Sequence, residues 1–383
     1  MKICIIANGY PDSHEPQFGC FELDQAVALS RYGHEVSIIY VDGRLRHYKR
    51  KFGITHIKNG NIHIYGLYLF PISVLAKISP IFHWWIRKMF LRIPFAKLVK
   101  NHGRPNILYA HFLQNISYAA YLKKKYNIPL VGIEHSSSLA KDKLTPDQIR
   151  IGNYGYSNCD NLISVSKSLQ NHIKRHFGKD SLIIHNMIGQ DFYNNQVKIE
   201  NDSTILKIIS VGSLLPVKGY DLLLEALYKI SSTLPKWRLV LIGDGSEHLN
   251  LQKKIEELGL SENVSLLGRK SKDVIVNYLN NSTMYVSSSR SENFSVSIIE
   301  ALSTGLPVVA TDCGGAKECI SEQNGLIAPV EDVDGLANAI LTMANSIHKY
   351  NRLSISENCK NLFGPNAIAS QLSNVFSKTV KQK

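Results

Sequence analysis

One stretch decides the fold: Leu206-Lys-Ile-Ile-Ser-Val-Gly-Ser-Leu-Leu-Pro-Val-Lys-Gly-Tyr-Asp221. The apolar run from Leu206 to Val211 is typical of a buried strand, the segment from Gly212 to Gly219 of a loop, and the residues after it of a helix. A strand, a glycine-bearing loop and a helix in this order begin a parallel β-α-β unit. We therefore predict that a doubly wound α/β domain starts at this strand.

The same order opens the chain. A strand from Lys2 to Ala7 precedes a loop that holds Gly9 and Gly19, and a helix follows from Phe21 to Arg31. Neither glycine loop has the G-x-G-x-x-G or G-x-x-x-x-G-K-[ST] spacing, so ordinary NAD or ATP binding is not predicted. Further strands are predicted at Glu35 to Val41, Ile62 to Tyr65, Ile107 to Ala110, Leu130 to Glu134, Leu162 to Val165, Ser181 to His185, Leu239 to Ile242, Val264 to Leu267, Met284 to Ser287, Val308 to Ala310 and Leu326 to Ala328.

Length and composition agree with two domains. At about 150 residues per domain, the 383 residues suffice for two, and 44% hydrophobic with 20% charged residues is an ordinary globular mixture. The polar stretch from Gln190 to Ser203 is the predicted linker, and the domains are assigned to residues 1–188 and 189–365. The six cysteines form no C-x-x-C pair, which argues against a zinc site and a disulfide framework and favours a reducing compartment.

Two apolar segments indicate where in the cell the protein is expected. The run after Met1 is too short for the central region of a signal peptide and is interpreted as the first strand. The longest apolar stretch, Leu67 to Phe82, is broken by Pro71, Lys77 and Pro80, whereas a bilayer span needs about 20 uninterrupted residues. We therefore expect a cytoplasmic protein without a membrane span.

The positive charge is concentrated in one segment. Between Asp42 and Glu134 the chain has no acidic residue, although its whole net charge is +13. The segment's basic residues are Arg44, Arg46, Lys49, Arg50, Lys51, Lys58, Lys77, Arg87, Lys88, Arg92, Lys97, Lys100, Arg104, Lys123, Lys124 and Lys125. Such an imbalance within one domain predicts an anionic partner.

Two carboxylates lie eight residues apart in Ser291-Glu-Asn-Phe-Ser-Val-Ser-Ile-Ile-Glu300. On one continuous helix they would point about 80° apart, so we predict that Glu292 lies in a loop and that a helix begins near Ser295. The amides of Phe294, Ser295 and Val296 would then form an anion site suited to a phosphate. Two exposed surface glutamates are the alternative that the spacing alone favours.

Further motifs surround these features in a fixed order: Pro16-Gln-Phe-Gly19, Gly33-His-Glu-Val36, Tyr109-Ala-His111, Ser164-Val-Ser166, His185-Asn186, Val211 to Asp221, Leu241-Ile-Gly-Asp-Gly245, Glu292 to Glu300, and Thr311 to Glu318. This set resembles glycosyltransferase family 4, the retaining nucleotide-sugar enzymes of GT-B fold. The resemblance spans nearly the whole chain and is strongest from Val211 to Gly325. It implies two doubly wound, Rossmann-like domains that face each other across a cleft, with residues 366–383 crossing back to the first domain.

The resemblance also implies residue roles. Lys218 is expected on the donor diphosphate, Glu292 on the hydroxyls of the transferred sugar, and Glu300 on the ribose. His111 matches the histidine beside the anomeric carbon, while His135 is weighed equally as a cleft-lining and as a structural residue. The remaining donor-binding residues are Gly19, Gly212, Ser213, Arg269, Phe294, Ser295 and Val296.

Two departures from the family pattern concern the donor. The family commonly has an arginine where this chain has Ser213, so one diphosphate cation is missing, and Arg269 is the candidate to replace it. The glycine of the family's E-x-F-G is Ser295 here, which either crowds the sugar pocket or adds a hydroxyl donor. Donor identity, and activity itself, depend on these two positions.

A basic, aromatic segment is a candidate membrane contact. In a helical projection Trp85, Phe90 and Ile93 fall on one face with Ile86 and Met89, and the cations fall outside it. This pattern is typical of an interfacial helix, and the residues assigned to membrane contact are Trp84, Trp85, Arg87, Lys88 and Arg92. The alternative is a core-packed helix with a solvated basic face. Anionic phospholipid or a lipid-linked pyrophosphate acceptor would explain the missing acids.

We therefore expect a retaining hexosyltransferase on the inner face of the cell membrane, which moves a sugar from a UDP- or GDP-sugar to a lipid-linked glycan of the cell envelope. No cofactor or metal is expected, because Lys218 and helix amides can stabilise the leaving diphosphate, and Asp332-Val-Asp334 is interpreted as a helix cap. The alternatives are a nucleotide-sugar epimerase or phosphorylase of the same fold and an inactive, membrane-associated assembly partner. No nucleic-acid partner is expected, because the basic region lacks a recognition module.

Overall fold

The computed structural model describes residues 1–15, 18–45, 52–72, 78–198 and 204–382, which form two compact units. Unit 1 comprises Met1–His185 and Asn366–Lys383, and unit 2 comprises Asn186–Pro365. Several predicted features lie outside the described residues: Pro16 and Gln17 of the first motif, Arg46, Lys49, Arg50, Lys51 and Lys77 of the basic segment, and residues 199–203 of the predicted linker.

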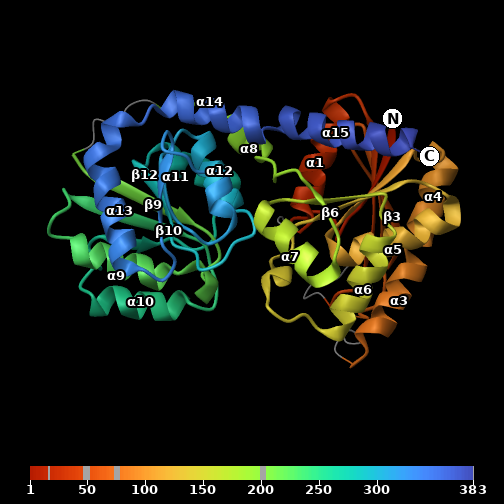
Figure 1. Cartoon of the computed structure of the whole chain (residues 1–383), viewed down its shortest axis with the longest axis horizontal. Coiled ribbons are helices and arrows are strands. Elements are labelled where there is room, and N and C mark those ends of the chain that lie inside the picture. Colours follow the sequence, from red (N-terminus) through yellow and green to blue (C-terminus); the bar gives the residue numbers. More distant parts are fainter. Residues whose placement is uncertain (16–17, 46–51, 73–77, 199–203, 383) are drawn as a thin grey trace. The chain divides into compact units, whose positions relative to one another are not determined.

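A sheet in the order β3-β4-β2-β1-β5-β6-β7-β8 forms the centre of unit 1 (Figure 1). Its strands are β1 (Lys2–Ile6), β2 (Glu35–Asp42), β3 (Gly53–Asn59), β4 (Ile62–Tyr68), β5 (Ile107–His111), β6 (Leu130–Glu134), β7 (Asn161–Ser164) and β8 (Leu182–Ile183). Of the strand pairs in the described part of this sheet, only β3–β4 is antiparallel. Strand β3 was not predicted, because its residues are mostly exposed and lack the apolar pattern of a buried strand.

Helices cover both faces of this sheet, namely α1 (Cys20–Arg31), α3 (Pro80–Phe90), α4 (Arg92–His102), α5 (Phe112–Tyr126), α6 (Pro146–Ser157), α7 (Lys167–Phe177) and α15 (Pro365–Lys381). The side chain of Tyr109 on β5 reaches both α1 and α15: its hydroxyl donates to Gln25 at 2.7 Å, and its ring packs on Phe376. Thr379 of α15 accepts a hydrogen bond from Asn161 at 2.8 Å. The C-terminal helix is therefore part of unit 1 (Figure 1).

Unit 2 has a parallel sheet in the order β11-β10-β9-β12-β13-β14. Its strands are β9 (Leu206–Val211), β10 (Trp237–Ile242), β11 (Val264–Leu266), β12 (Met284–Ser287), β13 (Val308–Thr311) and β14 (Gly325–Ala328). The helices are α8 (Gln190–Tyr193), α9 (Tyr220–Ile230), α10 (His248–Glu257), α11 (Lys272–Asn280), α12 (Val296–Ser303), α13 (Val333–Ser346) and α14 (Arg352–Phe363). A core of leucine, isoleucine and valine side chains joins α9 and α13 to the sheet.

The beginning of the predicted linker is part of the folded unit. Residues Gln190–Tyr193 form the short helix α8, and Phe192 within it is buried. The stretch is mostly polar, so its composition did not indicate that Phe192 packs into the core. The prediction of a linker was therefore wrong for these residues.

Two predicted helix caps are confirmed by their hydrogen bonds. Ser166 accepts from the backbone N–H of Leu169 at 3.0 Å and begins α7. Asp332 accepts from the N–H of Gly335 at 2.8 Å and begins α13. Each side chain satisfies an amide that has no partner within its helix. The D-x-D triplet therefore serves as a cap.

Among the described residues, no helix combines the length and the hydrophobicity required to cross a bilayer.

A buried histidine marks the carboxyl end of β5 in unit 1. The His111 ring is fully buried, and its Nδ1 lies 3.2 Å from His135 Nε2. Its Nε2 has no hydrogen-bond partner among the described residues. Burial, and secondarily the neighbouring His135, hold the pKa of His111 well below the usual 6.5. The His111 ring is therefore neutral in the folded chain near pH 7.

This depressed pKa predicts a pH dependence of stability. A histidine that stays neutral when folded contributes stability above its unfolded pKa of about 6.5, and the contribution is lost as the pH falls below that value. In His111→Gln, urea unfolding followed between about pH 7.5 and 5 should show a shallower loss of stability, by up to about 1.4 kcal/mol per pH unit. Equal slopes in the two proteins would contradict a buried neutral ring.

Candidate active site

The candidate site of unit 2 lies where the strand order reverses. Strand β9 has β10 on one side and β12 on the other, and ligands of open α/β sheets bind outside the carboxyl ends of the strands at such a point. A pocket opens there beside the ends of β9 and β12. It is lined by Ser210, Val211, Lys218, Tyr220, Tyr285, Ser287, Ser288, Ser289 and Ser297.

An ion pair joins the two loops at this pocket. Lys218, in the loop after β9, donates through Nζ to Glu292 Oε1, and Ser289 donates to the same oxygen at 3.2 Å. Both charged side chains are mostly buried, with exposed fractions of 23% and 16%. The structure thus brings together two of the residues that the sequence assigned to the donor.

The backbone of Glu292 is held from both sides. Its N–H donates to the Cys313 carbonyl at 2.8 Å, and its carbonyl accepts from the Gly315 N–H at 3.0 Å. A Cβ on Gly315 would lie 1.9 Å from the carbonyl oxygen of Asn293, which is closer than any side chain permits. The segment after β13 therefore needs glycine at this position in order to hold the carboxylate.

Helix α12 begins directly after this loop, as the spacing predicted. The first-turn amides of a helix have no acceptor within it, and Ser295, the N-cap residue of α12, makes no side-chain cap hydrogen bond to them. Glu300 lies inside α12 and Glu292 before it. Burial raises the pKa of Tyr285 to about 12, and Glu300 and Glu292 both add to that shift. The two carboxylates therefore act on one buried tyrosine.

Phe294, one of the residues assigned to the amide site, has a buried side chain. Its ring packs edge-on against Phe363 of α14 with the ring centroids 5.7 Å apart, and 6% of the residue is exposed. The side chain therefore anchors the loop in the core of unit 2. Any contact of Phe294 with a phosphate would have to come from its backbone.

Glycines allow the loops after β9 and β10 to approach. A Cβ on Gly243 would lie 1.8 Å from the carbonyl oxygen of Gly212, and Gly243 donates its N–H to Gly268 at 3.1 Å. Exposed Ser213 follows Gly212, and exposed Arg269 follows Gly268. Backbone contacts between neighbouring loops therefore connect the position of Arg269 to that of Ser213, where the family commonly has an arginine.

Two contributors to this site, Arg290 and Tyr285, lie outside the recognised motifs. Arg290 donates two hydrogen bonds to Asp221, at 2.8 and 2.7 Å, and one to the Pro216 carbonyl at 2.6 Å, which ties the two loops together. Tyr285 donates to Ser297 at 2.8 Å. The available signal was the run Ser287-Ser-Ser289 directly after a buried strand, since polar residues at a strand's carboxyl end point to a site.

In unit 1, the predicted residues gather around the ends of β1, β5 and β6. The rings of His111 and His135 stack with centroids 5.2 Å apart, and Phe112 after His111 has a φ of 67°. Such a backbone conformation costs about 1 to 3 kcal/mol in a residue other than glycine. Gly19 has a φ of 79°, and a Cβ on it would lie 2.4 Å from the Gly9 carbonyl oxygen. The turn at Phe112 is therefore strained, and the turn at Gly19 requires glycine.

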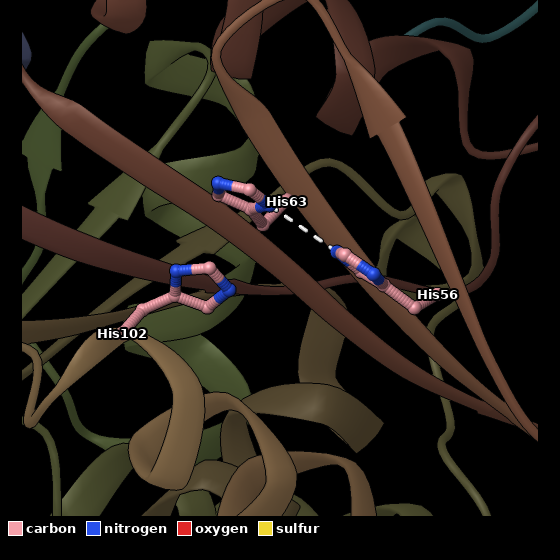
Figure 2. Close-up of side chains that lie close together, drawn as sticks. All are labelled: His56, His63 and His102. Atoms are coloured by element: carbon pink, nitrogen blue, oxygen red, sulfur yellow. Dashed lines mark hydrogen bonds between the residues drawn. The ribbon is translucent and has the colours of Figure 1, made fainter.

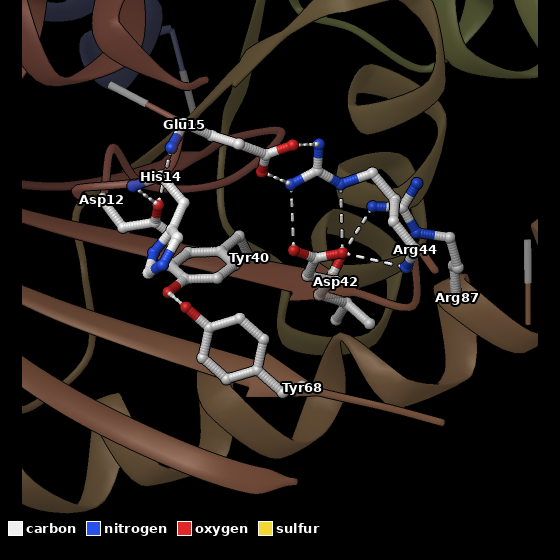
Figure 3. A network of polar contacts seen from close by, with 9 residues as sticks. Asp12, His14, Glu15, Tyr40, Asp42, Arg44, Tyr68 and Arg87 are labelled. Atoms are coloured by element: carbon white, nitrogen blue, oxygen red, sulfur yellow. Dashed lines mark hydrogen bonds and ion pairs between the residues drawn. The ribbon is translucent and has the colours of Figure 1, made fainter. Parts of the chain in front are cut away.

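The predicted orientation of helix α3 is partly wrong. Trp84 donates through Nε1 to Ser117 at 2.6 Å, and Lys88 lies over the Trp84 ring at 4.1 Å. Arg87 donates to the Val41 carbonyl at 2.5 Å, next to the network in which Arg44 pairs with Asp42 (Figure 3). These side chains are turned toward the rest of unit 1, so Trp84, Arg87 and Lys88 do not form an outward basic face.

The fifth assigned residue, Arg92, is also packed inward, because its Nε is buried without a partner in the described part of the chain. The apolar side chains of this region face outward instead. Phe82 is 50%, Trp85 49% and Ile93 45% exposed, and α3 buries none of its residues. The alternative of a core-packed helix with a solvated basic face is therefore wrong as well. Periodicity had separated the two faces correctly but could not tell which one docks on the domain.

Comparison with known proteins identifies the family of the chain. The family model for glycosyl transferases group 1 matches residues 191–358, and the model for glycosyltransferase family 4 matches residues 23–191. An uncharacterised glycosyltransferase of Methanocaldococcus jannaschii is 31% identical over 231 residues, which cover 59% of this chain and 62% of that relative. The chain thus spans less than two thirds of this relative's length.

Two further proteins align over most of the chain. The GPI3 subunit of phosphatidylinositol N-acetylglucosaminyltransferase from Saccharomyces cerevisiae is 26% identical, with 88% of this chain and 74% of that protein covered. The structure of Anabaena HepE, solved in complex with UDP, superposes with a TM-score of 0.72 at 19% identity, over 99% of this chain and 100% of that one. That likeness shows a shared GT-B fold. With one family model on each half, the chain belongs to the glycosyltransferases of group 1 and family 4.

Proposed function

We propose that this glycosyltransferase transfers a sugar, with retention of configuration, from a UDP- or GDP-sugar to a lipid-linked glycan in the assembly of cell-surface polysaccharide. The observation that carries the proposal is the Lys218–Glu292 pair, whose lysine lines the pocket beside the open N-terminus of α12. The likeness to a structure solved with UDP supports the donor class. The likeness to a phosphatidylinositol N-acetylglucosaminyltransferase subunit supports a lipid acceptor.

The pair supplies opposite charges to two adjoining parts of the donor, the diphosphate and the sugar bonded to it. The ammonium of Lys218 binds the diphosphate together with the first amides of α12, which favour an anion. The carboxylate of Glu292 accepts hydrogen bonds from the sugar hydroxyls, and Glu300 accepts those of the ribose. Because Lys218 and Glu292 already hold each other in place, both charges are oriented before the donor binds.

Charge stabilisation is the chemical task of these groups. When the bond from the sugar's anomeric carbon to the diphosphate oxygen breaks, the diphosphate keeps the electron pair and gains negative charge. Lys218 and the amides stabilise that charge, so this proposal requires no metal. The acceptor hydroxyl forms the new bond to the anomeric carbon and passes its proton to the departing diphosphate oxygen. His111 and its neighbour His135 are assigned to placing the sugar and the acceptor.

A surface on α3 and α4 is the proposed membrane contact at the inner face of the cell membrane. This α3–α4 surface consists of Phe82, Trp85, Phe90, Ile93, Lys97 and Lys100. The rings of Phe82 and Trp85 stack with centroids 6.4 Å apart, and Ile93, Lys97 and Lys100 follow one another on one face of α4. Exposed aromatics and exposed lysines on two consecutive helices suit the boundary of an anionic bilayer.

The donor proposal predicts selective stabilisation by one nucleoside diphosphate. At about 100 times its Kd, a ligand of the native state adds about 2.7 kcal/mol of stability and raises Tm. In Lys218→Ala the loss of one charge-assisted contact, about 1.5 to 3 kcal/mol, should weaken the Kd roughly 10- to 150-fold. Thermal shift with UDP, GDP, ADP and CMP, without divalent metal, measures this.

Lys229→Ala is the matched control for Lys218→Ala, because it breaks an exposed pair with Asp334 in the same unit. It should bind the nucleotide like the wild type. If no nucleotide shifts the melting of the wild type, the inactive assembly partner becomes the better interpretation.

Glu292→Ala should reduce turnover by on the order of 100-fold, because a contact to the reacting sugar is lost. Turnover is measured as sugar transfer to a lipid-linked acceptor, with Tm recorded to exclude unfolding. Glu322→Ala, an exposed carboxylate in the same unit, should leave turnover unchanged. Near-wild-type transfer by Glu292→Ala would remove this residue from the mechanism, and conversion of the donor without an acceptor would indicate an epimerase.

The membrane proposal predicts binding to vesicles that contain phosphatidylserine. Replacing both lysines, in Lys97→Ala with Lys100→Ala, should weaken binding about 30-fold at about 1 kcal/mol per charge. Replacing Phe82 and Trp85 by serine should weaken it at least about tenfold. Co-sedimentation measures both, and Tyr228→Ser, an exposed aromatic of unit 2, is the control. Equal sedimentation of all variants would exclude this surface.

A further inference from the structure

Three histidines gather at one edge of unit 1, on elements that the donor site does not use. His56 lies on β3, His63 on β4, and His102 is the last residue of α4 (Figure 2). One ring nitrogen from each histidine lies within 4.8 Å of those of the other two. Three imidazoles from three separate segments therefore converge on one place.

The backbone explains this convergence. Within the antiparallel pair, His56 is directly opposite Tyr65, and His63 is two residues before Tyr65. Side chains two residues apart on a strand share a face, so His56 and His63 are diagonal neighbours. Helix α4 packs on β4 and ends at this face. The hairpin thus supplies two rings, and the end of the helix supplies the third.

The separation of the nitrogens matches that of metal ligands. His56 Nε2 and His63 Nδ1 lie 3.2 Å apart. Two nitrogens, each about 2.0 to 2.1 Å from a tetrahedral zinc ion, lie about 3.3 to 3.4 Å apart. Bringing the third ring to the same separation requires a movement on the order of 1 Å, which a side-chain rotation provides.

Tyr65 orients two of the three rings. Its own ring stacks on His56 at 4.4 Å and an interplanar angle of 12°. Its hydroxyl lies 2.8 Å from His102 Nε2 and accepts a hydrogen bond from Asn101 Nδ2 at 2.9 Å. Metal-binding histidines are commonly held by such outer partners. The rings of His63 and His102 stack on each other with centroids 3.9 Å apart.

The ligand set selects the type of ion. Among the residues that the structure describes, the cluster consists of three imidazoles without a carboxylate or thiolate. Imidazole suits zinc, copper, nickel and iron, whereas magnesium and calcium prefer oxygen ligands. Three imidazoles with one water complete a tetrahedral zinc site.

We propose that His56, His63 and His102 bind one divalent transition-metal ion of the zinc class, with water in the fourth position. The ion ties the β3–β4 hairpin to the end of α4. Because β3 is an edge strand with mostly exposed residues, such a tie stabilises the least buried part of the sheet. The site does not depend on the proposed transferase activity.

Isothermal titration of the full, untagged chain with Zn²⁺ tests this proposal. We expect one ion per chain, and a loss of affinity of at least about tenfold in each of His56→Ala, His63→Ala and His102→Ala. His56 is exposed, so His56→Ala should fold normally. His348→Ala, an exposed histidine in unit 2, should bind Zn²⁺ as the wild type does.

A second measurement separates metal coordination from a change in folding. Co²⁺ in place of Zn²⁺ should give the visible absorption of a tetrahedral site in the wild type but not in His56→Ala. The proposal would be overturned by unchanged Zn²⁺ affinity in the three variants or by the absence of stoichiometric binding. It would also be overturned if the affinity were lost in His172→Ala, because His172 and His176 form a separate stacked pair on α7.

Discussion

The approach of two loops at backbone distance holds the candidate site of unit 2 together. A Cβ on Gly219 would lie 2.1 Å from the Ser288 carbonyl oxygen, and Ser288 donates to the Lys218 carbonyl at 3.0 Å. The backbone N–H of Arg290 donates to the Val217 carbonyl at 2.8 Å. These contacts place the loop after β9 against the loop after β12. Lys218 and Glu292 can pair only because their backbones are held this closely.

The same constraint organises the rest of the donor region. Glu292 is held by the segment after β13, and α12 begins four residues after it, so the carboxylate and the open helix end share one rigid frame. Backbone contacts and the hydroxyls of Ser288 and Ser289 form this frame, and both serines line the pocket. A rigid frame of this kind suits catalysis by pre-oriented charges, because the groups need not reorganise when charge develops.

Burial gives the histidines of unit 1 two different characters. His111 is fully buried, so its ring is kept neutral. Acid therefore lowers the stability of the folded chain through this residue. His56, His63 and His102 lie at a partly exposed edge, where an ion can reach them.

Packing also decides which side chains of helix α3 are exposed. Its cations are held against carbonyls and aromatic rings, so its exposed chemistry is apolar, and the exposed positive charge of the α3–α4 surface comes from Lys97 and Lys100 of α4.

The sequence by itself determined the α/β class, all strands except β3, the start of α12 and the caps at Ser166 and Asp332, because these follow from local periodicity and from side chains that bond to nearby amides. It also pointed to Lys218 and Glu292, since both lie in motifs. Only the tertiary structure decided which side of α3 faces the domain and that Arg290 links the site loops. It alone brought three histidines of distant segments together, because such contacts depend on packing between elements that no local pattern encodes.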